Sequence, residues 1–341
     1  MIRTLSTILC AVLCGAAQAA TLGVTSLSAT DTDAAVTVFY PSDAPARPVE
    51  RGPFRFDAAV DGAVLPGNGR LVVLSHGSGG VPWTYTVLAQ ALVDAGYVVA
   101  VPFHRGDNAL DPGSPGPDSW RQRPAEVSRA IDRVASDARF GPQLRLDRVG
   151  AYGMSAGGHT TLTLAGGRWS EANFRRHCEE HLDDDFPACV GLATRLTGGP
   201  LDGLKRWVAR RVIDWRFRDE SLLGHDDPRI AAAVAGVPFA ADFDMASLAT
   251  PRVPLALITA GRDLWLAPRF HSDRVMAACT PCEVIAAMPG AGHGALLAPP
   301  APVKGYLAEL LDDPPGFDRA VLTAIDARVV AFFDRHLAPL D

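Results

Sequence analysis

The sequence predicts an α/β fold in which helices cover both faces of a mostly parallel central sheet. Three observations lead to this prediction: short apolar segments recur along the chain, stretches with helical periodicity separate them, and no linker divides the chain. Strands that are apolar throughout are typical of a parallel sheet buried on both faces. A chain of 341 residues with 48% hydrophobic residues is long enough for one large domain of this class.

The order of the expected elements alternates between strand and helix along most of the chain. The expected strands are residues 34–40, 71–75, 97–101, 149–152, 231–237, 254–259 and 283–287. The expected helices are residues 84–95, 124–138 and 317–337, with Pro124 near the first position of the second helix. Residues 168–228 interrupt the alternation because they are polar and rich in Arg and Asp. We interpret them as an inserted cap; the alternative is a solvent-exposed helical excursion with no role at the site.

The first 19 residues have the pattern of a secretory signal peptide. Arg3 supplies the positive charge, Leu5–Leu13 the apolar run, and Ala17-Gln18-Ala19 an A-x-A cleavage site. The apolar run is too short to span a bilayer as a stable helix. We therefore expect a mature chain of residues 20–341 that has no transmembrane segment and is periplasmic or secreted.

Four cysteines remain after residue 19, and an oxidising compartment favours two disulfides among them. Proximity in the sequence favours the pairs Cys178–Cys189 and Cys279–Cys282, although three connectivities are formally open. The second pair forms a C-x-x-C motif, so a disulfide oxidoreductase is an alternative function. The motif lies between a helix and a late strand, which favours a structural role. No second C-x-x-C or H-x-x-x-H accompanies it, and we expect no metal site.

The charge of the chain gives no indication of a nucleic-acid partner. Its net charge is −6, and basic residues do not recur as a patch along the sequence. One basic run does occur at residues 205–211, and we interpret it as the solvated face of a helix.

The motif that indicates chemistry is Gly153-Met154-Ser155-Ala156-Gly157, which follows an apolar strand and precedes a helical segment. This G-x-S-x-G context is typical of a nucleophile elbow, a sharp turn that exposes the serine hydroxyl. A serine needs a general base, and the base needs an orienting carboxylate. Asp263 and His293 follow the strands 254–259 and 283–287, so all three side chains are expected at one edge of the sheet.

Several other residues compete for these roles or complete the site. Asp242 and Asp244 are the alternative acids, whereas His159 and His104 are more typical of structural histidines. We assign one oxyanion donor to the backbone N–H of Ala156 at the helix start. The second is the N–H of Ser78, with Gly79 as the alternative, in the glycine-rich loop after residues 71–75. Two tryptophans, Trp83 and Trp265, are candidates for the walls of the substrate pocket.

These motifs resemble those of the α/β-hydrolase superfamily over about residues 34–337. Within it, the segments Val38–Ser42 and His76–Trp83 and the serine elbow resemble bacterial dienelactone-hydrolase-like and platelet-activating-factor-acetylhydrolase-like serine esterases. True dienelactone hydrolases use a cysteine where this chain has Ser155, so their particular substrate does not carry over.

The resemblance implies a carboxylic ester hydrolase that forms an acyl-enzyme on a small-molecule or lipid-like ester and requires no cofactor. An amidase or peptidase would use the same Ser-His-Asp triad. A non-catalytic binding protein of this fold would usually have lost a member of the triad.

Overall fold

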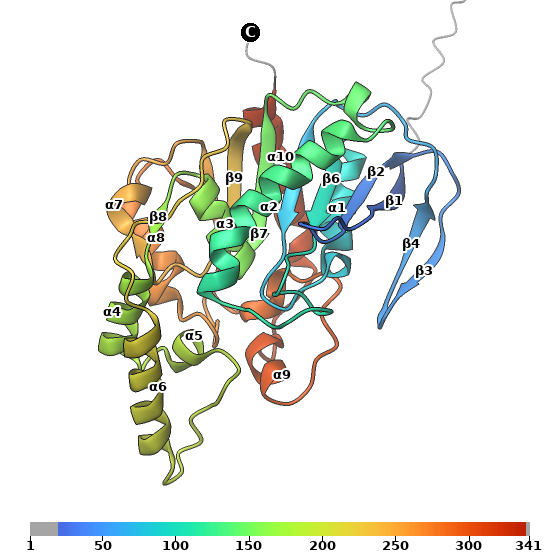
Figure 1. Ribbon diagram of the computed structural model, residues 1–341. Helices are drawn as coiled ribbons and strands as arrows, with labels where there is room; N and C mark the ends of the chain where they lie inside the picture. The colour runs from blue at the N-terminus through green and yellow to red at the C-terminus, as the bar shows by residue number, and fades with distance from the viewer. Residues whose placement is uncertain (1–19, 339–341) are drawn as a thin grey trace, which may run out of the picture.

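A ten-stranded sheet forms the centre of the computed structural model, which describes residues 20–338 (Figure 1). The strand order is β12-β11-β9-β7-β5-β6-β2-β1-β4-β3, and the six strands from β12 to β6 are parallel. The strands β2 and β1 extend this core with antiparallel pairing. The strands are β1 (Thr21–Leu27), β2 (Val36–Ser42), β3 (Arg47–Arg51), β4 (Phe54–Val60), β5 (Leu71–Ser75), β6 (Val98–Pro102), β7 (Val149–Met154), β9 (Ile230–Gly236), β11 (Leu255–Ala260) and β12 (Glu283–Met288).

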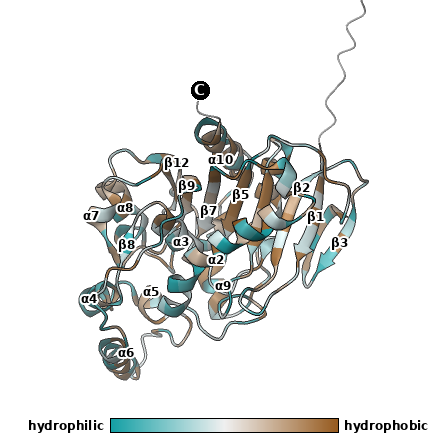
Figure 2. Ribbon diagram, turned by 45° about the horizontal axis from the view of Figure 1, so that its top comes forward, coloured by the Kyte–Doolittle hydropathy of each residue, from teal (hydrophilic) through white to brown (hydrophobic). Residues whose placement is uncertain are grey.

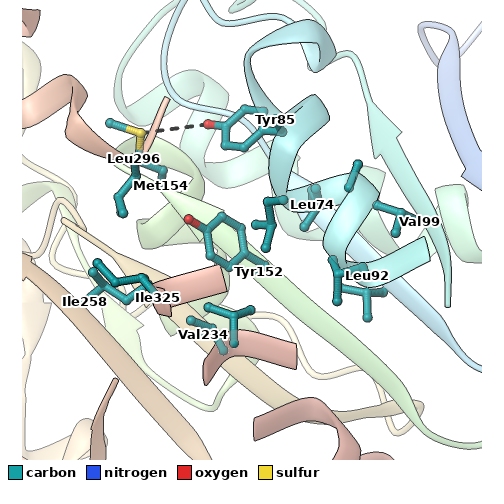
Figure 3. Packing of buried hydrophobic residues seen from close by; sticks show 14 of the residues in the cluster. Leu74, Tyr85, Leu92, Val99, Tyr152, Met154, Val234, Ile258, Leu296 and Ile325 are labelled. Atoms are coloured by element: carbon teal, nitrogen blue, oxygen red, sulfur yellow. Dashed lines mark hydrogen bonds between the residues drawn. The ribbon is translucent and has the colours of Figure 1, made fainter. Parts of the chain in front are cut away.

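Helices cover both faces of this sheet, as predicted. On one face α1 (Thr86–Asp94) and α10 (Val321–Leu337) enclose an apolar core; on the other lie α2 (Pro117–Ser136), α3 (Ala156–Leu164) and α8 (Ser272–Ala278). Figure 3 shows part of the first core, where Tyr152 of β7 lies among side chains from the neighbouring strands and from α1 and α10. In Figure 2 the parallel strands are predominantly hydrophobic, whereas β3 at the far edge is hydrophilic.

The expected strands all occur, with ends shifted by at most two residues. The prediction that Pro124 lies near the start of a helix was wrong, because α2 begins at Pro117 and contains Pro124 in its interior. Pro117 occupies the first turn, where a missing N–H costs nothing. Pro124 removes one internal backbone hydrogen bond, which the buried packing of α2 tolerates. The pattern also missed β1, β3, β4 and α9 (Tyr306–Leu311).

Residues 168–228 leave the sheet after α3 and return at β9. They contain β8 (Arg168–Trp169), α4 (Glu171–His181), α5 (Phe186–Val190) and α6 (Asp202–Arg216), which lie together at one side of the molecule (Figure 1). At the base of this excursion, β8 pairs with β10 (Phe243–Asp244), and Trp169 forms a bridge with Leu223. The two ends of the insertion are therefore held close together.

A buried carboxylate ties the insertion to the rest of the molecule. Asp185 accepts hydrogen bonds from His177 of α4 at 2.8 Å and from His271, which precedes α8, at 3.0 Å. Burial alone raises the pKa of Asp185, but the two imidazole hydrogen bonds outweigh it and bring the pKa to about 2. The carboxylate is therefore ionised at neutral pH and joins two segments that are 86 residues apart in the sequence.

The structure pairs the cysteines in the way that sequence proximity favours. Cys178 and Cys189 connect α4 with α5, with their Cα atoms 5.7 Å apart. Cys279 and Cys282 close the turn before β12, with a Cα separation of 5.5 Å. The predicted signal peptide, residues 1–19, lies outside the described residues. Within residues 20–338, no helix combines the length and apolar character needed to cross a membrane.

Candidate active site

Ser155 lies in a sharp turn between β7 and α3. Its backbone has φ 58° and ψ −119°, a conformation that is unusual for a residue other than glycine. A Cβ at Gly157 would collide with the carbonyl oxygen of Ser75, and a Cβ at Gly153 would collide with the backbone of Gly157. Only glycine fits at these two positions, so the turn has the geometry expected of a nucleophile elbow.

Three side chains from three strand ends form a continuous hydrogen-bonded chain. His293 Nε2 lies 3.0 Å from Ser155 Oγ, and His293 Nδ1 lies 2.7 Å from Asp263 Oδ2. The second oxygen of Asp263 accepts backbone N–H groups from Trp265 and Leu266, each at 2.8 Å. Since Nδ1–H donates to the carboxylate, Nε2 is left to accept the serine proton. His293 and Asp263 are both buried, at 1% and 6% exposure.

The alternative acids lie elsewhere. Asp242 is completely buried and bonds to His159 Nε2 at 3.0 Å, within a cluster of aromatic rings. Asp244 accepts the N–H of Ala246 and caps the short helix α7 (Met245–Leu248). Neither carboxylate has a hydrogen bond to His293 among the described residues. The geometry therefore favours Asp263 as the partner of the histidine.

The expected structural role of His104 agrees with its surroundings. Its ring lies 2.8 Å from Ser75 Oγ and 2.6 Å from Glu126. Burial and the nearby positive charge of Arg123 hold the pKa of His104 well below its usual value, and burial raises the pKa of Glu126. The contact between His104 and Glu126 is therefore a buried hydrogen bond.

The loop after β5 faces the nucleophile. Gly77 packs against Ser155, since a Cβ at this glycine would lie 3.4 Å from the serine Cβ. The N–H of Gly77 donates to Tyr85 Oη at 3.3 Å, and the N–H of Gly79 donates to Asp107 at 3.0 Å. Among the described residues, the N–H of Ser78 has no acceptor. Ser78 rather than Gly79 is therefore the residue of this loop with a free donor.

A buried ion pair that the sequence analysis missed holds this loop in place. Asp107 Oδ1 accepts Ser78 Oγ–H at 2.5 Å, and its Oδ2 accepts Arg123 Nη2–H at 2.8 Å. Arg123 also donates to the carbonyl of His76 and to Ser119 Oγ. Both charged side chains are at most 1% exposed. The sequence did carry one indication, because Arg123 falls on the apolar face of its helix, where a cation needs a partner.

Of the two candidate pocket tryptophans, one lies beside the histidine. The Trp265 ring centroid is 5.3 Å from that of His293. Trp83 instead contacts Phe56 at 5.7 Å and Phe39 at 6.4 Å, on the side of the N-terminal strands. Among the described residues, Trp83 has no aromatic contact with His293, so its role in the pocket wall stays a prediction.

An open hollow of about 550 Å³ lies between the insertion and α9, which are neighbours in Figures 1 and 2. An ion pair between Arg195 and Glu309 at 2.7 Å lies at its wall, where Arg195 also stacks on Tyr306. The hollow is lined by Asp183, Asp184, Phe186, Pro187, Arg195, Leu196, Thr197, Tyr306 and Glu309. Within residues 20–338, no group of three or more His, Cys, Asp or Glu side chains is arranged to hold a metal ion.

No protein-family model matches the sequence, and no curated protein is significantly similar to it. Among solved structures, the chain is similar to a ferulic acid esterase from Streptomyces cinnamoneus, with a TM-score of 0.59 over 95% of this chain and 92% of that one. The chain has the α/β-hydrolase fold. Since the identity is 19%, the likeness concerns the fold, and the finer resemblance to dienelactone-hydrolase-like esterases rests on the motifs alone.

In an α/β-hydrolase fold, reacting groups gather where the parallel strands end. Here Ser155 follows β7, Asp263 follows β11 and His293 follows β12. The arrangement supplies a serine, a base that is positioned to take its proton, and a carboxylate that orients the base. Such a set can carry out acyl transfer.

Proposed function

We propose that this protein is a serine hydrolase that cleaves carboxylic esters. The observation that carries the proposal is the hydrogen-bonded chain from Ser155 through His293 to Asp263, with separations of 3.0 and 2.7 Å. These are the distances at which a serine, a base and an orienting carboxylate can act as one unit. The α/β-hydrolase fold and its likeness to a structure that is named as an esterase support the choice of an ester.

The proposed reaction begins when His293 Nε2 takes the proton of Ser155 Oγ and the oxygen attacks the ester carbonyl. The tetrahedral oxyanion accepts hydrogen bonds from the N–H groups of Ala156 and Ser78. Ala156 is the first residue of α3, so its N–H has no partner within the helix and lies at the positive end of the helix dipole. His293 then protonates the leaving alcohol, and water releases the acyl group by the same steps in reverse order.

We propose that Trp265 forms one wall of the site and that the insertion of residues 168–228 acts as its cap. The backbone N–H of Trp265 donates a hydrogen bond to Asp263, and this bond keeps the Trp265 ring beside His293. The buried Asp185 with its two histidines fixes the insertion to the body of the molecule. We therefore expect a small ester or a lipid-like ester as the substrate, bound between the cap and the strand ends.

The test is hydrolysis of p-nitrophenyl esters from acetyl to long acyl chains by the wild type and by Ser155→Ala. We expect kcat/KM to fall by about 10⁴-fold or more in the variant, because the triad residues act as a unit. Ser136→Ala, at the exposed end of α2, is the matched control and keeps full activity. Undiminished hydrolysis by Ser155→Ala would refute the mechanism. Faster turnover of matched p-nitroanilides would indicate that the substrate is an amide rather than an ester.

We also infer that the protein acts outside the cytoplasm. The pairs Cys178–Cys189 and Cys279–Cys282 support this, because disulfides persist in oxidising compartments. The expected mature N-terminus is Ala20. Mass spectrometry of the exported protein measures it, and recovery of the intact chain from the cytoplasm would contradict export.

A further inference from the structure

The helix α6 carries a second apolar face that is largely exposed in the described structure. Fourteen large hydrophobic side chains are strongly exposed in residues 20–338, and six of them lie between Leu201 and Trp215. Trp207 is 57% exposed and Trp215 is 73% exposed. The six side chains are Leu201, Leu204, Trp207, Val208, Val212 and Trp215.

These six residues share one side of the helix. At 100° per residue, their positions cover an arc of about 140°, opposite the side on which Ile213 is buried. The 15 residues of α6 give a stripe about 22 Å long, and Figures 1 and 2 show α6 at the outer edge of the insertion. Exposed apolar patches of this extent mark a binding surface.

Positive charge borders this stripe. Residues 201–218 contain six Lys or Arg and two Asp, a local charge of +4 on a chain whose net charge is −6. On the helix, Lys205 and Arg216 lie along one edge of the stripe, whereas the other edge carries Asp214 with Arg210 beyond it, and Arg206 lies on the opposite side near Ile213. Arg211 lies within the stripe, with its guanidinium 6.0 Å from the ring centre of Trp207, and has no carboxylate partner among the described residues.

Lys205 pairs with the buried carboxylate of Asp202 at 2.8 Å, whereas the other paired cations contact surface carboxylates and stay available. Arg206 and Arg210 both contact Asp183, and Arg216 contacts Asp118; the two carboxylates are 62% and 50% exposed. Ion pairs at such exposed sites contribute little free energy, so the cations can exchange one anion for another.

We propose that α6 docks on an anionic lipid surface, with its axis in the plane of the interface. A helix with aromatic and aliphatic side chains on one face, and with Lys or Arg within this face and along one of its edges, is suited to lie at the boundary between headgroups and acyl chains. Tryptophan prefers this boundary, and Lys and Arg extend toward the headgroups. A second copy of this chain is the less suitable occupant, because pairing two α6 helices would bring their unpaired Arg211 side chains and the other cations of the stripe close together. The inference is independent of the proposed catalysis.

The experiment is flotation with vesicles of phosphatidylcholine that contain 30% phosphatidylglycerol, with pure phosphatidylcholine for comparison. We expect the wild type and Ser155→Ala to bind the anionic vesicles equally, with a blue shift of tryptophan emission. Binding by Trp207→Ser/Trp215→Ser falls by about tenfold or more, because the stripe loses its two interfacial anchors. Trp207→Phe/Trp215→Phe keeps most of the binding but loses the shift. Arg211→Gln weakens binding by about fivefold, the value of one cation near an anionic surface.

The control is the variant Val321→Ser. Val321 is an exposed apolar residue on α10, so this variant should bind like the wild type. All variants should keep wild-type unfolding temperatures. The proposal is overturned if the wild type does not bind anionic vesicles at low salt, or if it binds neutral vesicles equally well. Unchanged binding by Trp207→Ser/Trp215→Ser also overturns the proposal. So does a wild-type dimer, seen in sedimentation analysis, that the same double variant abolishes.

Discussion

The loop that presents Ser78 depends on one buried carboxylate, and Asp107→Asn tests this dependence. Asparagine keeps an oxygen for the Ser78 hydroxyl and the Gly79 N–H, but it places an NH₂ group against Arg123, where the carboxylate now accepts a hydrogen bond at 2.8 Å. The guanidinium is 0% exposed and would be left without its counter-charge. Breaking a buried ion pair in this way costs about 3–5 kcal/mol of unfolding free energy.

The same substitution should slow the reaction, because Arg123 also holds the carbonyl of His76 and thereby the start of the loop. If the Ser78 N–H moves away from the oxyanion, kcat falls by about 10²–10³-fold, the effect of losing one oxyanion donor. The measurements are urea unfolding followed by circular dichroism and initial rates on a p-nitrophenyl acetate series. Ser78→Ala is the control, since it removes only a hydroxyl hydrogen bond and should cost about 1 kcal/mol.

A double variant distinguishes the effect of an unpaired buried charge from the effect of a displaced Ser78 loop. Asp107→Leu/Arg123→Met removes both charges, so it should unfold at a higher urea concentration than either single variant. Its kcat should stay low, because nothing then fixes the loop. The reasoning is refuted if Asp107→Asn keeps both the unfolding free energy and the kcat of the wild type.

Four further variants test stability and the geometry of the elbow. Burial raises the pKa of Asp326 to about 7, so the native state retains a proton that the unfolded chain has released. The free energy of unfolding should therefore fall as the pH rises from about 4 to 7, and Asp326→Asn should remove this slope in urea titrations. Replacing Cys279 and Cys282 together by Ser should cost about 2 kcal/mol, the entropy of a short closed loop, without loss of ester hydrolysis; an activity that survives Ser155→Ala and vanishes on Cys282→Ser would instead favour a disulfide oxidoreductase. Gly157→Ala should give no active enzyme, whereas Gly203→Ala, which meets no atom within 4 Å, should stabilise α6 by about 0.5–1 kcal/mol in thermal unfolding.

The central sheet and the order of its strands along the chain could be predicted because buried parallel strands consist of unbroken runs of apolar residues. The same runs located Ser155, Asp263 and His293, since each follows directly after one of them. The edge strand β3 and its neighbour β4 were missed because both are partly solvated and mix polar with apolar residues, and β1 was missed because Gly, Thr and Ser interrupt its apolar run.

The contacts behind the site could not be predicted in this way. Asp107 and Arg123 meet only when the loop after β6 folds over α2; the apolar helix face indicates that Arg123 needs a partner, but the sequence does not indicate which carboxylate it is. The choice between Asp242 and Asp263 likewise depends on a long-range contact, because Asp242 forms its hydrogen bond with His159. Long-range pairing of polar groups has no periodicity, so it requires the three-dimensional structure.

The insertion begins and ends at nearly the same place, where Trp169 bridges Leu223 and β8 pairs with β10. Because both ends are anchored there, the segment between them can be lengthened, shortened or exchanged while the strand ends that carry the triad stay in position. Under the roles proposed for the site and for α6, a change in this one module would vary the substrate range and the surface affinity. An engineer can use the same two junctions to graft a different module onto an unchanged sheet.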